Sequence, residues 1–166
     1  MKKIAVALLL SAFFAAPAVA ADGKKNIGIS YGLDNDGVVG IQGEFDISSS
    51  VNNAPISAQL FWKSYSQTYS RTAGTYQYSY SGLGVAALYD FGAVVKQDTK
   101  IRPYAGLGIF ALNNTLSGPA APLDVAADSG GLYVIAGVRY AATTEISADL
   151  NYNNIGGLTI GANFKF

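Results

Sequence analysis

Apolar residues recur at every second position in eight separate runs, and this period constrains the fold more than any other feature. Residues two apart share one face of a β-strand, whereas an amphipathic helix repeats near 3.6 residues. After residue 20, no stretch keeps a helical repeat for more than a turn. An all-β chain of eight strands is therefore predicted. Its outward rows run through Ile27 to Leu33, Val39 to Ile47, Ile56 to Trp62, Leu83 to Phe91, Ile101 to Ile109, Leu132 to Tyr140, Ile146 to Tyr152 and Leu158 to Phe166.

The first 20 residues have the pattern of a signal peptide. A positive start precedes an apolar run from Ile4 to Phe14, and Ala18-Val19-Ala20 is a small-x-small cleavage pattern. The alternative, a membrane anchor, needs about 20 apolar residues, and Pro17 interrupts this run. We therefore expect residues 1–20 to be removed and residues 21–166 to form one exported β-barrel domain.

The composition limits the compartment and the partners. Without Lys2 and Lys3, the exported chain keeps 9 of the 11 basic residues and all 11 acidic ones, a net charge of −2. We therefore expect no nucleic-acid partner, because binding nucleic acid needs a basic patch. There is no Cys, so disulfides do not hold the domain together. Charged residues make up 13% of the chain and Gly is frequent, as in a sheet that faces lipid on one side.

Aromatic residues sort to the two ends of the predicted outward face if both termini lie in the periplasm. A soluble barrel has the same alternation but no reason to sort its rings, whereas a bilayer favours aromatic side chains at its two interfaces. The pattern predicts an eight-stranded antiparallel up-and-down transmembrane β-barrel. The lower girdle is Phe45, Tyr89, Phe91, Tyr140, Phe164 and Phe166, and the upper girdle is Tyr31, Trp62 and Tyr152.

Three segments resemble small outer-membrane barrels of the OmpA-like, OmpX-like and opacity type. Arg102 to Gly108 is similar to their Pro-Tyr-x-Gly-x-Gly stretch, and Tyr89-Asp90-Phe91 and Gly137 to Tyr140 are similar to strand ends of neisserial surface protein A and its relatives. The last strand resembles the signal by which such barrels are recognised for assembly. That signal comprises Leu158, Ile160, Ala162, Phe164 and Phe166.

The resemblance implies a place and a set of partners. It implies a Gram-negative outer membrane, contact with membrane lipid and lipopolysaccharide, and insertion by the barrel assembly machinery. The chain ends with the eighth strand, so the peptidoglycan-binding domain of full OmpA is not expected.

The sequence argues against catalysis and against a cofactor. It has no His and no Cys, which removes the commonest general base, metal ligand and thiol nucleophile. Asp34-Asn35-Asp36-Gly37 lacks the rest of a calcium loop and is expected to form a hairpin turn. Gly106 and Gly108 lie inside a strand and are expected to leave room for larger neighbours in the lumen. We expect no enzyme, no metal and no cofactor.

The predicted inward face carries seven charged residues. They fit a selectivity filter or, alternatively, a plug of ion pairs. Because the interior of an eight-stranded barrel is just wide enough for side chains to fill, we expect the plug. The set is Glu44, Asp90, Arg102, Arg139, Glu145, Asp149 and Lys165.

The second candidate site is the segment from Ser64 to Ser81, which is rich in Tyr, Ser and Thr. Such a composition suits an adaptable binding loop, and it also suits a hairpin that extends the sheet above the membrane. Tyr76, Tyr78 and Tyr80 either point into the upper lumen or follow a bulge near Gly82. The candidate residues are Tyr65, Tyr69, Arg71, Tyr76, Tyr78 and Tyr80.

These observations lead to two functional hypotheses. The first is a non-enzymatic surface barrel that supports the envelope, or binds an extracellular ligand of unknown identity through its upper loops. The long connections Ser64 to Gln77 and Asn113 to Gly131 are then expected to face outward. The second is a narrow porin or an OmpW-like transporter of small or hydrophobic solutes.

Overall fold

The computed structural model describes residues 25–33, 37–72, 74–94, 100–119 and 129–166 of the chain. Most of these residues lie in eight strands, as the alternation predicts. The strands are β1 (Lys25–Gly32), β2 (Val39–Asp46), β3 (Ile56–Arg71), β4 (Gly74–Asp90), β5 (Ile101–Ser117), β6 (Ser129–Ala141), β7 (Ile146–Asn153) and β8 (Gly157–Lys165). The predicted signal peptide and the turn at Asp34 to Asp36 lie outside the described residues.

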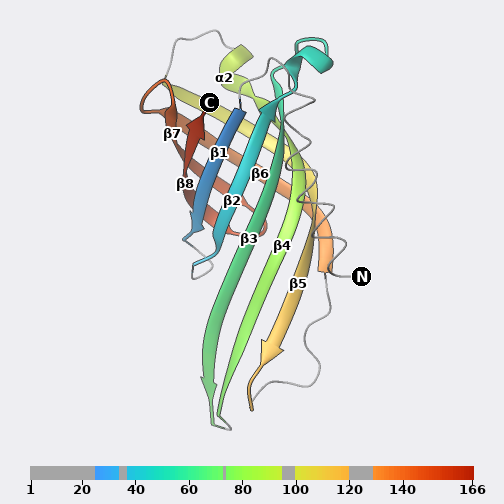
Figure 1. The fold of residues 1–166 in the computed structure, drawn as a ribbon, viewed down its shortest axis with the longest axis vertical. Helices are drawn as coiled ribbons and strands as arrows, with labels where there is room; N and C mark the ends of the chain where they lie inside the picture. The colour runs from blue at the N-terminus through green and yellow to red at the C-terminus, as the bar shows by residue number, and fades with distance from the viewer. Residues whose placement is uncertain (1–24, 34–36, 73, 95–99, 120–128) are drawn as a thin grey trace.

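The sheet closes on itself. Each strand pairs antiparallel with the next, and β8 pairs with β1, for example through Ile29 and Ala162 (Figure 1). Where all eight strands surround the interior, closure pairs every strand on both sides, which a strand-built protein needs in lipid. The predicted eight-stranded antiparallel barrel is confirmed. Within the described residues, no helix is both long and apolar enough to cross a membrane.

Two short helices mark one end of the barrel, which we call the turn rim. They are η1 (Ser48–Ser50) between β2 and β3, and α2 (Phe91–Val94) after β4. The sequence analysis placed Phe91 in the fourth strand, and this is wrong by one residue. Asp90 Oδ1 accepts a hydrogen bond from the backbone N–H of Ala93 at 3.1 Å, which favours a helical turn directly after the strand.

The apolar rows face outward and the rows between them face the lumen. Ile29, Leu107 and Ile109 are each 60% exposed or more. Gly28 and Gln59, which lie on the inward rows, are buried. An outer surface of this kind is unfavourable in water, at about 25 cal/mol per Å² of apolar area, and suits contact with lipid.

The barrel has walls of two heights. We call β3, β4, β5 and β6 the tall wall, and β1, β2, β7 and β8 the short wall. β2 pairs with β3 as far as Ser64, and β3 then continues to Arg71. The end of the tall wall, opposite the turn rim, is the hairpin rim. There β3, β4 and β5 project far beyond the short wall at the bottom of Figure 1, and β6 ends higher.

The segment from Ser64 to Ser81 contains the ends of two paired strands, which is the extended hairpin that the sequence left open beside a binding loop. β3 and β4 pair without a slip from Ile56 and Tyr89 to Arg71 and Gly74. Tyr and Thr are good strand formers, so their alternation continues the hairpin beyond the barrel.

The unbroken register also shows whether the tyrosines of β4 point into the lumen or follow a bulge. There is no bulge near Gly82, and Tyr76, Tyr78 and Tyr80 lie on the inward face. The predicted loop from Asn113 to Gly131 is likewise shorter, because β5 runs to Ser117 and β6 starts at Ser129.

Candidate functional site

The inward face of the sheet carries two chemically different regions. The first, which we call the lumen network, is polar and lies where all eight strands surround the interior. It consists of Glu44, Lys63, Tyr104, Arg139, Asp149, Asn151 and Asn153. The second, which we call the tyrosine trough, lies against the tall wall near the hairpin rim. It is lined by Tyr65, Tyr69, Tyr78, Tyr80, Phe110, Leu112, Asn114, Ser129, Asn154 and Ile155.

Arg139 on β6 is the centre of the lumen network. Its Nη2 lies 2.6 Å from Glu44 Oε2 on β2, and its Nε lies 3.1 Å from Asp149 Oδ2 on β7. Its guanidinium carbon lies 4.3 Å from the centroid of the Tyr104 ring, whose hydroxyl donates to Asp149 Oδ1 at 2.9 Å. One cation thus joins three strands, and both of its carboxylate partners are buried.

The row of β7 residues that faces inward extends this network toward the hairpin rim. Asn151 Nδ2 donates to Asp149 Oδ1 at 2.5 Å, and Asn153 Nδ2 donates to Asn151 Oδ1 at 2.9 Å. Asn153 Oδ1 accepts from Lys63 Nζ on β3 at 2.5 Å. The network therefore crosses the barrel as a continuous set of hydrogen bonds and contains two cations and two carboxylates, so its charges balance.

The structure brings together three of the seven charged residues singled out in the sequence, namely Glu44, Arg139 and Asp149. Asp90 and Arg102 form a separate ion pair at the turn rim, where the Arg102 side chain is 44% exposed. Glu145 is exposed in the turn between β6 and β7. Lys165 is half-buried at the end of β8, and among the described residues no ion pair joins it or Glu145 to the network.

Sequence reasoning missed four members of the network, three because it counted charge alone and one because of its height in the barrel. Tyr104, Asn151 and Asn153 are uncharged, and Lys63 lies above the charged cluster on the inward row of β3. The signal that could have found the asparagines is the spacing Asp149-x-Asn151-x-Asn153, which places three hydrogen-bonding side chains on one face of one strand.

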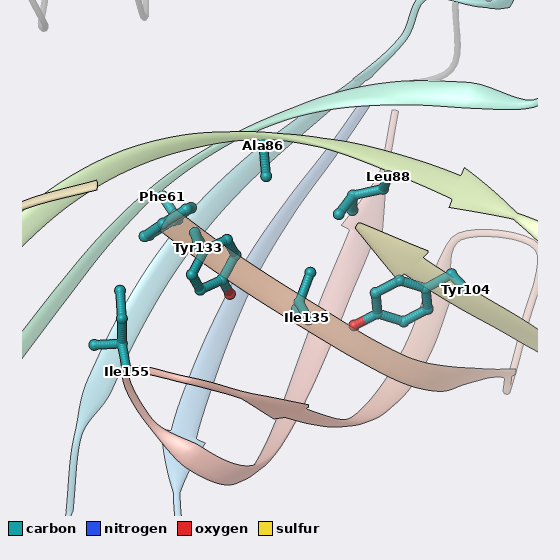
Figure 2. Packing of buried hydrophobic residues seen from close by; sticks show 7 residues of the cluster. All are labelled: Phe61, Ala86, Leu88, Tyr104, Tyr133, Ile135 and Ile155. Carbon is teal, nitrogen blue, oxygen red and sulfur yellow. The ribbon is translucent and has the colours of Figure 1, made fainter. Parts of the chain in front are cut away.

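An apolar plug separates the lumen network from the trough. Phe61, Tyr133 and Ile155 are 2%, 1% and 8% exposed, and the Phe61 and Tyr133 ring centroids are 4.2 Å apart. Figure 2 shows these three side chains gathered at one end of the buried cluster, with Leu88 and Tyr104 at the other. The interior is therefore filled by side chains between its two regions.

Local sequence explains why these large side chains fit inside the barrel. Phe61 pairs across β3 and β4 with Gly84, and a Cβ on Gly84 would collide with the Phe61 ring. Leu88 stands opposite Gly106 in the same way. The strand glycines therefore leave room for their larger cross-strand partners, as the sequence analysis expects for Gly106 and Gly108.

The turn between β7 and β8 folds inward and completes the plug. Asn153 Oδ1 accepts hydrogen bonds from the backbone N–H groups of Ile155 and Gly156, at 3.3 and 2.8 Å. The Asn154 side chain makes two hydrogen bonds to the backbone of β6. It donates to Leu132 O at 2.7 Å and accepts from the Val134 N–H at 3.0 Å. Ile155 is thereby held over the lumen.

The tyrosines of the hairpin lie in contact above the plug. The rings of Tyr65 and Tyr80 are stacked with centroids 5.3 Å apart, and those of Tyr69 and Tyr76 are stacked at 5.2 Å. The Tyr78 hydroxyl donates to Asn114 Oδ1 on β5 at 3.2 Å. Five of the six predicted surface residues thus share the inward face, and the sixth, Arg71, ends β3.

The predicted assembly signal follows the outward row of β8. Leu158, Ile160 and Phe164 are exposed on the outer surface. Phe166 follows the strand at 69% exposure, and its ring is stacked with that of Phe164 at 6.5 Å. The residues form one apolar stripe along the seam where β8 meets β1.

The sequence of the barrel shows which protein family the chain belongs to. Residues 50–165 match the family model described as "Opacity family porin protein". The chain belongs to the opacity family. The matched range includes β3 to β8, and with them Arg139, Asp149 and the whole tyrosine trough. No curated protein matches the chain in sequence.

Solved outer-membrane barrels share the fold of this opacity-family chain. Ail of Yersinia pestis, in complex with the heparin analogue sucrose octasulfate, has 13% identity and a TM-score of 0.57, over 87% of this chain and 99% of Ail. Neisserial surface protein A has 19% identity and a TM-score of 0.56, over 87% and 96%. The N-terminal β-barrel domain of Pseudomonas aeruginosa OprF has 16% identity and a TM-score of 0.57, over 87% and 100%. The predicted resemblance to small outer-membrane barrels of the opacity type is confirmed.

Proposed function

We propose that this opacity-family barrel is a non-enzymatic, non-conducting surface protein of the outer membrane, which acts through the part of the tall wall that stands above the bilayer. The observation that carries the proposal is the filled lumen. Phe61, Tyr133 and Ile155 pack across it, and a charge-balanced network lies below them. A selectivity filter works through uncompensated charge in a water-filled passage, whereas the described part of this interior is filled by side chains whose charges balance.

Residues that reach the outer end are therefore the ones available for contact. The tall wall presents the tyrosine trough there, and it contains the polar aromatic residues that adaptable binding surfaces use. The barrel supports the envelope by its insertion, and it contacts other molecules through this surface. The narrow porin or OmpW-like transporter is the competing hypothesis, and steady conductance would favour it.

The route to the membrane is part of the same proposal. Residues 1–20 direct export and are removed, and the apolar stripe that ends at Phe166 is bound by the barrel assembly machinery. Deleting Phe166 should leave unassembled protein in the periplasm. Protein that still migrates as the folded, fast form at normal yield would show that this residue is not part of the signal.

The orientation can be tested with single cysteines, because the chain has none of its own. Ser70→Cys lies near the hairpin rim and Ser49→Cys lies at the turn rim, and both positions are exposed. A membrane-impermeant maleimide should label Ser70→Cys on intact cells, and Ser49→Cys only after the outer membrane is opened. The reverse pattern would place the trough in the periplasm and overturn the proposal.

A further inference from the structure

The tyrosine trough is a hollow of about 420 Å³ that is closed at its base. Small-ligand sites span about 300 to 1,000 Å³, so the hollow is large enough to hold part of a ligand. Its base is Ile155, whose carbonyl oxygen accepts a hydrogen bond from the Tyr80 hydroxyl at 3.4 Å. Because the plug lies directly below, the trough does not continue into the lumen network.

Ring faces make up one component of the trough lining. Tyr65, Tyr69, Tyr78 and Tyr80 come from the β3–β4 hairpin, and Phe110 comes from β5. Tyr69 is 37% exposed, whereas Tyr65 is 8% exposed and forms the deeper part. The faces of such rings carry partial negative charge and attract the C–H groups of a flat, saturated ring laid against them.

Hydroxyl and amide groups form the second component, and they lie between the rings. Asn114 on β5 accepts from the Tyr78 hydroxyl, and its Nδ2 lies 3.5 Å from Ser129 Oγ on β6. The Tyr65 and Tyr69 hydroxyls lie 3.1 Å apart. Asn and Tyr side chains offer both donors and acceptors, and together these groups match a ligand that carries many hydroxyls.

The charge of the lining narrows the ligand class further. None of the described side chains that line the trough is charged. The described lining offers an anionic ligand no cation. An acyl chain would keep water from the hydroxyl and amide groups, whose remaining donors and acceptors would then go unused, and this costs free energy. A ligand that is apolar on its ring faces, rich in hydroxyls at its edges and uncharged satisfies both components.

We propose that the trough binds an uncharged oligosaccharide, with a sugar ring against the tyrosine faces and its hydroxyls bonded to Asn114 and the tyrosine hydroxyls. This site rests on the surface-barrel function proposed above and names its ligand class. The ligand chemistry is shared by free glycans and by the uncharged outer sugars of lipopolysaccharide.

The test is calorimetric binding to the full barrel in phosphatidylcholine nanodiscs, which carry no sugar. The probes are hexasaccharides of α1,4-glucose, β1,4-glucose, β1,4-mannose and β1,4-N-acetylglucosamine, with sucrose octasulfate as the polyanion. At least one uncharged probe should bind. Tyr69→Leu and Tyr78→Leu should each weaken its binding about two- to tenfold, the range expected for one aromatic contact.

Matched variants separate binding from folding. Tyr152→Leu removes an outward tyrosine of the short wall and should bind like the parent. Tyr78→Phe keeps the ring and loses the hydroxyl bonded to Asn114, so it should bind between Tyr78→Leu and the parent. Binding of sucrose octasulfate alone, binding of no uncharged probe, or equal binding by parent and leucine variants would each overturn the assignment.

Further outcomes distinguish lipopolysaccharide from a free glycan as the source of the sugar. They also distinguish failure of the oligosaccharide site from failure of the surface-barrel proposal. If lipopolysaccharide sugars occupy the trough, adding lipopolysaccharide to the discs should weaken probe binding by the parent, and an unchanged affinity would indicate a free glycan. If the parent binds no uncharged probe while the Ser70→Cys variant is labelled on intact cells, the oligosaccharide proposal is overturned and the surface barrel stands. Labelling of Ser70→Cys only in opened cells overturns the surface barrel itself.

Discussion

The lumen network and the tyrosine trough lie on the same inward face of one sheet, yet their chemistry is opposite. In the network, eight strands surround the side chains, and Asp149 is 3% exposed. Its carboxylate is bonded to Arg139, Tyr104 and Asn151. In the trough, the tall wall and the turn between β7 and β8 back the side chains, and Tyr69 is 37% exposed.

The difference shows how confinement decides which polar groups a barrel uses. Where strands exclude water on every side, a charge persists only with an opposite charge and hydrogen bonds beside it. Where the short wall does not reach, water can hydrate hydroxyl and amide groups. Uncharged aromatic side chains can therefore lie there without a charged partner. The network is accordingly expected to be sensitive to single substitutions, and the trough tolerant of them.

The largest effect is expected for Arg139→Ala. It leaves Glu44 and Asp149 without their shared cation in a confined space, and breaking a buried pair in this way costs about 3 to 5 kcal/mol. Val138→Ala, on the adjacent outward position, should cost about 1 kcal/mol. The free energies of unfolding can be measured by urea titration in lipid vesicles, with the folded fraction read from gel migration. Equal values for the two variants would mean that the network adds nothing to stability.

The next effect is expected for the plug. Phe61→Ala removes a ring that packs against Tyr133 over Gly84, and the cavity left behind should cost about 3 kcal/mol. The control is Phe164→Ala on the outer surface, where lipid fills the space of the missing ring. The same titration measures both. If Phe61→Ala destabilised the barrel no more than the control, the plug would be loosely packed.

A smaller effect is expected where the two regions meet. Asn153→Leu removes the acceptor for Lys63 and for the backbone N–H groups of Ile155 and Gly156, at a cost of about 2 kcal/mol. Hydrogen exchange should accelerate at the two turn amides before it changes elsewhere. Protection at these amides equal to that in the parent would show that the turn is held by other contacts.

The smallest effect on stability is expected in the trough. Tyr69→Leu removes one stacked pair near the hairpin rim, which is worth about 1 kcal/mol. Because the residue lies far from the plug, the urea midpoint should stay close to that of the parent while oligosaccharide binding weakens. A loss as large as that of Arg139→Ala would contradict the contrast between the two regions.

The alternation of the sequence predicted the barrel because the period is a local property. Residues such as Ile27, Ile29 and Tyr31 share the outer face of one strand, and contact with lipid makes that face apolar along its whole length. The strand lengths were harder to predict. Tyr76 and Tyr78 belong to the inward row, so their phase differs from that of the outward Leu83 and Val85, and a polar hairpin that continues a strand resembles a loop in composition.

The partners inside the lumen could not be predicted, because they depend on the stagger between strands that are distant in sequence. Glu44 and Arg139 are 95 residues apart and meet only after β8 closes on β1. The sequence showed that both face inward, and charge counting then grouped them with Glu145 and Lys165. Height along the barrel axis separates these residues, and a single strand carries no information about that height.

Side chains close the barrel between its two regions, and single-channel recording in planar bilayers can show whether any passage remains. Barrel protein shown to be folded by its gel migration should give no steady current steps. Phe61→Gly with Ile155→Gly, which removes two of the three plug side chains, should give current more often than the parent. A parent that conducts steadily in both polarities would show an open passage past Phe61, Tyr133 and Ile155 and would contradict the account.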